Sequence, residues 1–108
     1  MRYCLALDLQ DDNTIIAEYE KWHQQVWPEI KTSIVDSGIN QMEIYRTGNR
    51  LFMMMETLDT FSFERKAIQD VNNPKVVEWE KLMWNYQKAL PWAKDGEKWV
   101  VMKCIFAL

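Results

Sequence analysis

The stretch INQMEIYRTGNRLFMMMETL, residues 39–58, decides the fold of this chain. It holds two runs rich in Ile, Met, Phe and Tyr on either side of Gly48-Asn49. Such runs are typical of strands, and the dipeptide between them suits a tight hairpin turn. The stretch therefore predicts two antiparallel strands that lie side by side. Side chains alternate along a strand, so Met42 and Glu43 are expected on opposite faces of the sheet.

Helical patterns flank this hairpin on both sides. From about Asn13 to Val35, apolar residues recur at steps of three and four, and Ser37-Gly38 follows as a helix end. After the hairpin, a second helix is expected over Ser62–Asp70. A third is expected from Pro74, a common first helical residue, to about Leu90.

Apolar runs at the two ends supply the remaining strands, Arg2–Leu9 and the closing segment KWVVMKCIFAL, residues 98–108. The order βαββαβ, with the second helix in two pieces, predicts one α+β domain over residues 1–108 of the ferredoxin-like, dimeric α/β barrel type. Its helices should cover one face of an antiparallel sheet. The many Met, Phe and Trp residues indicate that the second face is covered too, and a homodimer is the simplest means.

Composition narrows the possible partners. The 108 residues are 48% hydrophobic, their net charge is -3, and Lys and Arg are scattered. A nucleic-acid partner is therefore not expected. No stretch has the length of a membrane span or the pattern of a signal peptide, so a cytoplasmic protein is expected. Cys4 and Cys104 are interpreted as buried free thiols, and the single histidine argues against a dedicated metal site.

The segment EKWHQQVWPEI, residues 20–30, holds that histidine, His23, on the apolar side of the first helix. Pro28 has no N–H for the carbonyl of Gln24, so the helix should bend or loosen there. Two interpretations of His23 and Tyr19 stay open at this point. They are core residues with hydrogen bonds to backbone or water, or they form the wall of a polar pocket with His23 as a general acid or base.

Several segments resemble the L-rhamnose mutarotase family of small ferredoxin-like dimers, and together they cover nearly the whole chain. The most specific is the pattern Tyr19, His23, Trp27, Pro28 and Glu29. The others are SGINQMEIYRTGNRLFMMME, NNPKVVEWEKLMWNYQKALP and the closing hydrophobic strand. The resemblance implies a cofactor-free isomerase that interconverts the α and β anomers of a 6-deoxy monosaccharide.

Carried over by position, the resemblance makes His23 the proton donor, Tyr19 a sugar-binding hydroxyl and Trp79 an aromatic contact to the sugar. Two positions depart from the family pattern. Met42 stands where the rhamnose enzymes have a sugar-binding tyrosine, and Glu80 replaces a second tryptophan after Trp79. These changes affect the sugar contacts and make L-fucose a candidate substrate beside L-rhamnose.

Mutarotation requires an acid at the ring oxygen and a base at the anomeric hydroxyl. His23 can serve one side, and Tyr19, Glu80 or a water can serve the other. Two further functions share this fold: another cofactor-free enzyme, such as a small monooxygenase or an isomerase of aromatic compounds, and a ligand-binding domain without catalysis.

Overall fold

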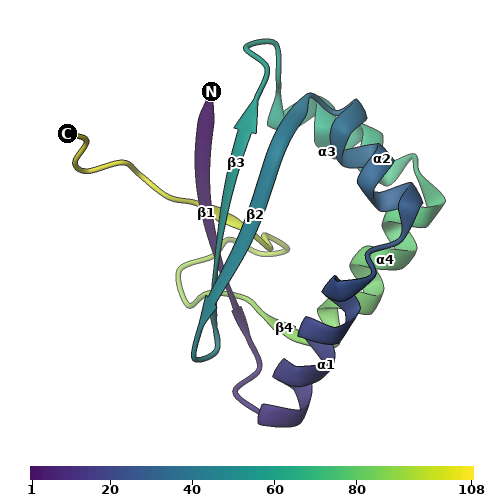
Figure 1. Ribbon diagram of the computed structural model, residues 1–108, viewed down its shortest axis with the longest axis vertical. Coiled ribbons are helices and arrows are strands. Elements are labelled where there is room, and N and C mark those ends of the chain that lie inside the picture. The colour runs from purple at the N-terminus through teal and green to yellow at the C-terminus, as the bar shows by residue number, and fades with distance from the viewer.

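The computed structural model describes all residues, 1–108, and shows one antiparallel sheet with helices on one side (Figure 1). Along the chain the elements are β1 (Arg2–Leu9), α1 (Asn13–Gln24), α2 (Pro28–Asp36), β2 (Ile39–Thr47), β3 (Arg50–Thr57), α3 (Phe63–Val71), α4 (Pro74–Trp84), β4 (Gln87–Lys88) and β5 (Val100–Val101). The strand order is β2-β3-β1-β4, and β5 also pairs with β1. The predicted ferredoxin-like arrangement is confirmed.

The predicted hairpin is present, with β2 and β3 antiparallel from Thr47 opposite Arg50 to Met42 opposite Met55 and beyond. Gly48 has a φ of 55°, which glycine adopts without the steric cost other residues meet. Strand β1 pairs with the other edge of β3 and lies in the middle of the sheet.

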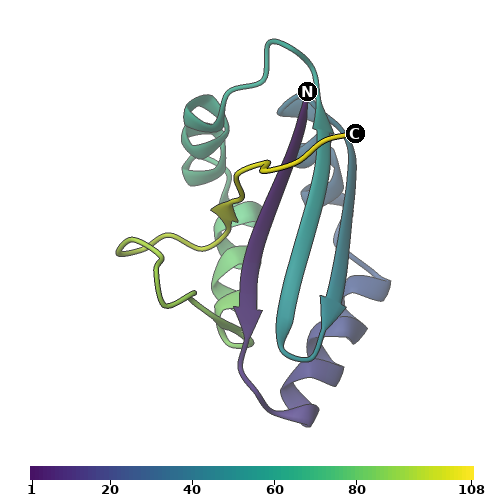
Figure 2. The ribbon, with the colours of Figure 1, turned by 90° about the vertical axis from the view of Figure 1, so that its left-hand side faces the viewer.

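The helices cover one face of the sheet and leave the other open, as Figure 2 shows from the open side. Alternation along the strands turns Leu7, Leu9 and Leu51 toward the helices, where all three are buried. They form one core with residues from three helices, namely Ile16, Tyr19, Ile30, Val76, Trp79 and Met83.

The first helical stretch is broken rather than bent, which corrects the prediction of one helix from Asn13 to Val35. Helix α1 ends at Gln24, and α2 begins at Pro28. Trp27, the residue before the proline, has a ψ of 137°, because the proline ring disfavours helical backbone at that position. The break turns the chain between two short helices that both contribute to the core.

The C-terminal third differs from the prediction in three respects. Helix α4 ends at Trp84 instead of continuing to Leu90. The closing strand is reduced to Val100–Val101, which pairs with Leu5 and Ala6 of β1, while β4 pairs with Asp8 and Leu9 on the same edge. Residues 102–108 are exposed and outside the sheet, so Cys104 is an exposed thiol and not a buried one, whereas Cys4 is half-buried. None of the helices could cross a membrane by its length and apolar content.

Candidate active site

A cavity of about 890 Å³ lies between the sheet and the helices, and 17 of its 27 lining residues are hydrophobic. Its volume and apolar lining fit a small-molecule site. All five residues that the sequence predicted for the site line this cavity: Tyr19, His23, Met42, Trp79 and Glu80.

Tyr19 and His23 lie one helical turn apart on α1, with their ring centroids 4.3 Å from each other. Nδ1 of His23 is 2.8 Å from the carbonyl oxygen of Tyr19. A carbonyl only accepts, so Nδ1 carries the proton of the neutral ring and Nε2 keeps its lone pair. Nε2 makes no hydrogen bond within the chain. The backbone thus satisfies one ring nitrogen and leaves the other available to a ligand.

Burial favours the neutral form of His23. The pKa of its imidazole is lowered by loss of solvent, and the hydrogen bond to the Tyr19 carbonyl offsets this only in part. At neutral pH the ring is therefore uncharged, and Nε2 is a proton acceptor.

The Tyr19 side chain is only 3% exposed. Burial raises the pKa of its hydroxyl to about 12, although a hydrogen bond from Gln87 acts in the opposite direction. The Tyr19 oxygen accepts this bond from Nε2 of Gln87 over 3.3 Å. Since the oxygen is the acceptor here, the hydroxyl proton of Tyr19 is free to be donated elsewhere.

Trp79 lines the cavity beside His23, and two further tryptophans pack behind it. The Trp79 ring is buried and lies 5.0 Å from that of Trp27, 6.3 Å from that of Trp22 and 5.7 Å from that of His23, all edge to face. Trp22 donates its indole N–H to the Tyr86 hydroxyl at 3.0 Å. The rings pack against one another in fixed orientations, which is typical of a rigid aromatic wall.

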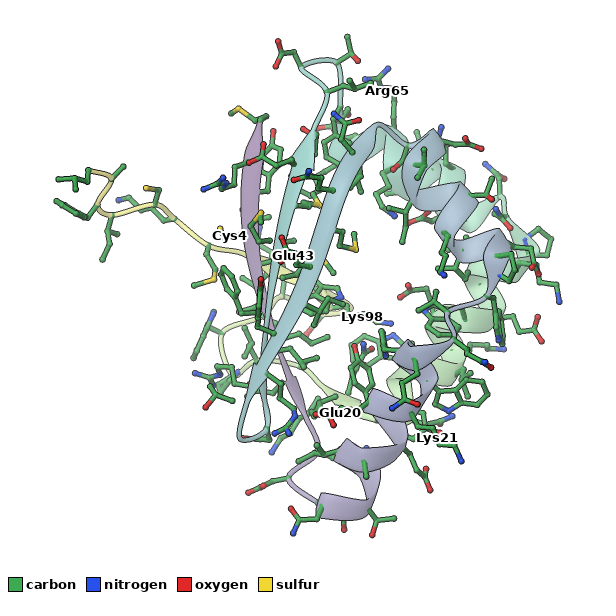
Figure 3. The ribbon with its side chains drawn as sticks, viewed as in Figure 1. Cys4, Glu20, Lys21, Glu43, Arg65 and Lys98 are labelled. Carbon is green, nitrogen blue, oxygen red and sulfur yellow. The ribbon has the colours of Figure 1, made fainter.

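Glu80 follows Trp79 on α4 and lies at the edge of the cavity, with its side chain 48% exposed. Its carboxylate pairs with the ammonium of Lys98, which reaches the space between the sheet and the helices (Figure 3). Nζ of Lys98 also lies 4.8 Å from the centre of the Trp84 ring. The sequence did not predict this ion pair, because 18 residues separate the two partners.

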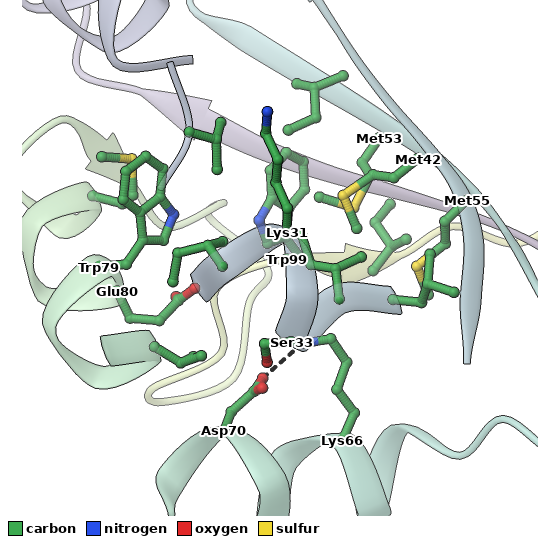
Figure 4. Close-up of a pocket in the computed structure, with 18 of the residues that line it drawn as sticks. Lys31, Ser33, Met42, Met53, Met55, Lys66, Asp70, Trp79, Glu80 and Trp99 are labelled. Carbon is green, nitrogen blue, oxygen red and sulfur yellow. Dashed lines mark hydrogen bonds and ion pairs between the residues drawn. The ribbon is translucent and has the colours of Figure 1, made fainter. Parts of the chain in front are cut away.

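Met42 points from β2 into the cavity beside Met53 and Met55, opposite Trp79 and Glu80 (Figure 4). The part of the strand wall formed by these three methionines is therefore apolar. A thioether cannot donate a hydrogen bond, so this wall offers contact area rather than polar recognition.

A second ion pair lines another part of the cavity, and it too was not predicted from the sequence. Lys66 and Asp70 are separated by one turn of α3, and Nζ of Lys66 lies 2.7 Å from Oδ2 of Asp70. Ser33 also lines this part of the cavity (Figure 4). The spacing of Lys66 and Asp70 is that of a common surface pair, which carries no signal for a pocket. No three His, Cys, Asp or Glu side chains meet in a group that could hold a metal ion.

Fold and cavity together define a small ferredoxin-like α+β domain with a mainly apolar pocket, aromatic walls and one uncharged imidazole. The sequence model of the L-rhamnose mutarotase family matches residues 2–108. The chain therefore belongs to this family and is a sugar mutarotase, a carbohydrate isomerase.

Among relatives, an L-fucose mutarotase from Xanthomonas campestris is 46% identical over 99% of this chain and 87% of its own length. An L-rhamnose mutarotase from Phocaeicola vulgatus is 35% identical over 64% of this chain and 61% of its own. Among solved structures, the L-rhamnose mutarotase of Formosa agariphila has a TM-score of 0.73 at 21% identity, covering 100% of this chain and 98% of that one. This last likeness concerns the fold.

Proposed function

We propose that this chain interconverts the α and β anomers of L-fucose, with His23 as its central acid–base group. One observation carries the proposal: Nε2 of His23 has no partner within the chain and lies in a cavity that Tyr19 and Trp79 also line. The 46% identity to an L-fucose mutarotase supports the choice of sugar.

Ring opening breaks the bond between C1 and the ring oxygen, and C1 becomes an aldehyde. The anomeric hydroxyl loses a proton and the ring oxygen gains one. Neutral His23 accepts the first proton at Nε2. After rotation about the C1–C2 bond, the ring closes on the other face of the aldehyde, and the imidazolium returns its proton to the new anomeric oxygen. His23 is thus a base in ring opening, which differs from the expectation of a proton donor, and it donates the proton in ring closing.

The proton for the ring oxygen comes from the Tyr19 hydroxyl, which has no acceptor within the chain. On ring closure the ring hydroxyl gives this proton back. Glu80 suits this donor role less well, because its carboxylate is already paired with Lys98. Glu80 instead binds a sugar hydroxyl at the edge of the cavity, where a charged group forms a strong hydrogen bond.

Trp79 supplies the flat surface on which the apolar face of the sugar stacks. Met42 lies on the opposite wall and contacts the sugar through its apolar side chain. Since Met42 replaces a hydroxyl donor of the rhamnose enzymes, a sugar that does not need this hydrogen bond is favoured. This difference supports L-fucose over L-rhamnose.

Exchange NMR tests the proposal on L-fucose, L-rhamnose and D-glucose under the same conditions. We expect the protein to accelerate α–β exchange of L-fucose most, because the pocket lacks the hydroxyl at residue 42. D-Glucose, with its extra hydroxyl at C6, serves as the control. Equal rates with and without protein for both 6-deoxy sugars would refute the proposal. If the exchange of L-rhamnose is accelerated more than that of L-fucose, the proposed substrate is wrong but the proposed mechanism still holds.

We also propose that two chains form a homodimer through the open face of the sheet. Apolar side chains are exposed in the C-terminal residues 102–108, where Ile105 is 90% and Phe106 78% exposed. A surface of this kind is stabilised by a partner. Sedimentation equilibrium should give twice the chain mass of 13.0 kDa, and a single-chain mass at micromolar concentration would contradict the dimer.

We also propose that the protein is cytoplasmic, and its two free thiols support this location. Detection of the native protein in the cytosolic fraction of its source cells tests this location. Its recovery with intact disulfides from an oxidising compartment would oppose it.

A further inference from the structure

Gln87 lies where the sheet meets the cavity. It is the first residue of β4 and pairs with Leu9 of β1. Residues directly opposite each other in antiparallel strands point to the same face. Leu9 belongs to the core under the helices, so the Gln87 side chain points there too, and it is only 5% exposed. It also lines the cavity that holds Tyr19 and His23.

The Gln87 amide is only half satisfied. Its Nε2 donates to the Tyr19 hydroxyl over 3.3 Å, whereas Oε1 has no hydrogen-bond partner. Oε1 is the one fully buried side-chain nitrogen or oxygen in the chain that lacks a partner. Turning the amide by 180° exchanges the two atoms and leaves Nε2 unpaired instead. One polar atom of Gln87 is left over in either orientation.

Such an atom is rare in a folded protein, because a buried polar group without a hydrogen bond is costly. A sugar hydroxyl matches it well, since a hydroxyl can donate to Oε1 or accept from Nε2. The cavity is the place from which that hydroxyl would arrive.

We propose that Gln87 is a further sugar-binding residue, whose amide binds a hydroxyl at C2, C3 or C4 of the sugar while it holds the Tyr19 hydroxyl in place. The proposal rests on the mutarotase function given above. It adds a residue from β4 to predicted site residues that come from α1, β2 and α4.

Gln87 has a second effect through Tyr19. Its hydrogen bond opposes the rise in the Tyr19 pKa that burial causes, so Tyr19 is a better proton donor with Gln87 than without it. Gln87 therefore acts on sugar affinity directly and on proton transfer through Tyr19.

The first experiment replaces Gln87 with methionine, which has a similar length and shape but no amide. We expect KM for the proposed sugar to rise about 10-fold and kcat to fall less, since one hydrogen bond to the sugar is lost. Thermal unfolding of the free protein should stay the same or shift upward, because the unpaired atom is removed. Gln69→Met on the exposed side of α3 is the matched control and should change neither quantity.

The second experiment separates a sugar contact from a purely structural effect. The KM ratio of Gln87→Met to wild type is measured with L-fucose and with its 2-deoxy, 3-deoxy and 4-deoxy analogues. For the analogue that lacks the bound hydroxyl, the ratio should return to about 1, since the contact is already absent. An equal ratio for all four sugars, or an unchanged KM for L-fucose, overturns the proposal.

The wild type provides a third readout that needs no substitution. The side-chain amide signals of Gln87, assigned through their contacts with the Tyr19 ring, should shift when L-fucose is added. Unmoved signals at saturating sugar would overturn the sugar contact. If the wild type neither binds a 6-deoxy sugar nor accelerates its exchange, the proposed function itself fails, and this outcome is distinct from a failure of Gln87 alone.

Discussion

Replacing His23 with alanine is expected to lower the catalysed rate of anomer exchange by about 10²–10⁴-fold, to near the rate in buffer. The reason is that, in the proposed mechanism, His23 supplies the uncharged ring nitrogen that accepts the anomeric proton. Two-dimensional exchange NMR at saturating L-fucose measures the rate directly. His23→Gln replaces the imidazole with a polar amide of similar length. It should be equally inactive, and it should disturb the neighbouring Tyr19 ring less than alanine does.

Gln24→Ala is the matched control, because Gln24 is the next residue on α1, is exposed and does not line the cavity. It should keep the wild-type rate. Circular dichroism of each variant confirms that it is folded. Wild-type exchange in either folded His23 variant would show that another group transfers the proton.

The pH profile of the wild type follows from the same imidazole. Its pKa lies below the ordinary 6.5, so the ring is neutral at pH 7 and takes up a proton only in more acidic solution. The rate should therefore be constant near neutrality and fall as the pH drops below 6.5. A rate that rises on acidification would mean that the imidazolium is the reactive form.

Replacing Trp79 with alanine is expected to lower the free energy of unfolding by about 3–5 kcal/mol. Trp79 is 6% exposed, and its ring meets Trp22, His23 and Trp27 edge to face. Its removal leaves a cavity that the surrounding rings cannot fill without losing their own contacts. For a small domain this loss is a large share of total stability. Urea unfolding followed by far-UV circular dichroism gives the difference.

Trp92→Ala is the control for this prediction. Trp92 is 63% exposed, and the Arg50 guanidinium lies 5.6 Å from its ring centre. The free energy of unfolding of this variant should fall by less than about 1 kcal/mol. Equal losses for the two variants would contradict the central role of Trp79 in the core.

Local sequence signals predicted the hairpin and the helix-covered sheet because they act over short distances. The turn at Gly48 and the alternation of Met42 with its neighbours specify register without help from the rest of the chain. At Pro28 the sequence predicted the position of the helix interruption correctly, but it predicted a bend where the helix is in fact broken. Whether a proline bends or breaks a helix depends on the packing of the two halves, and here both halves enter the core.

The closing segment was predicted less well, because apolar composition alone does not decide how far a strand pairs. Residues 98–108 are as apolar as a strand, but only Val100 and Val101 pair with β1. Gln87 and Lys88 pair with Asp8 and Leu9 on the same edge, and this second partner lies in a segment that was predicted as helix.

The five predicted site residues converge on one cavity. Tyr19 and His23 were candidates from their position on the helix, and the family resemblance added the other three. Lys98 and Gln87 were missed for a physical reason. Their partners Glu80 and Tyr19 lie 18 and 68 residues away in the chain, and polar residues in a loop or a two-residue strand resemble ordinary surface residues until the fold is known.

The position of Gln87 opposite Leu9 has a consequence for how the enzyme becomes active during folding. The hydrogen bond to Tyr19 joins two parts of the chain that are far apart in sequence, and β4 can form only on an existing β1. Contacts of such high sequence separation form late, once the loops between them have closed. We therefore expect a nascent or partly unfolded domain to have the histidine before it has the Gln87 contact, and to reach full sugar affinity only once β4 has formed.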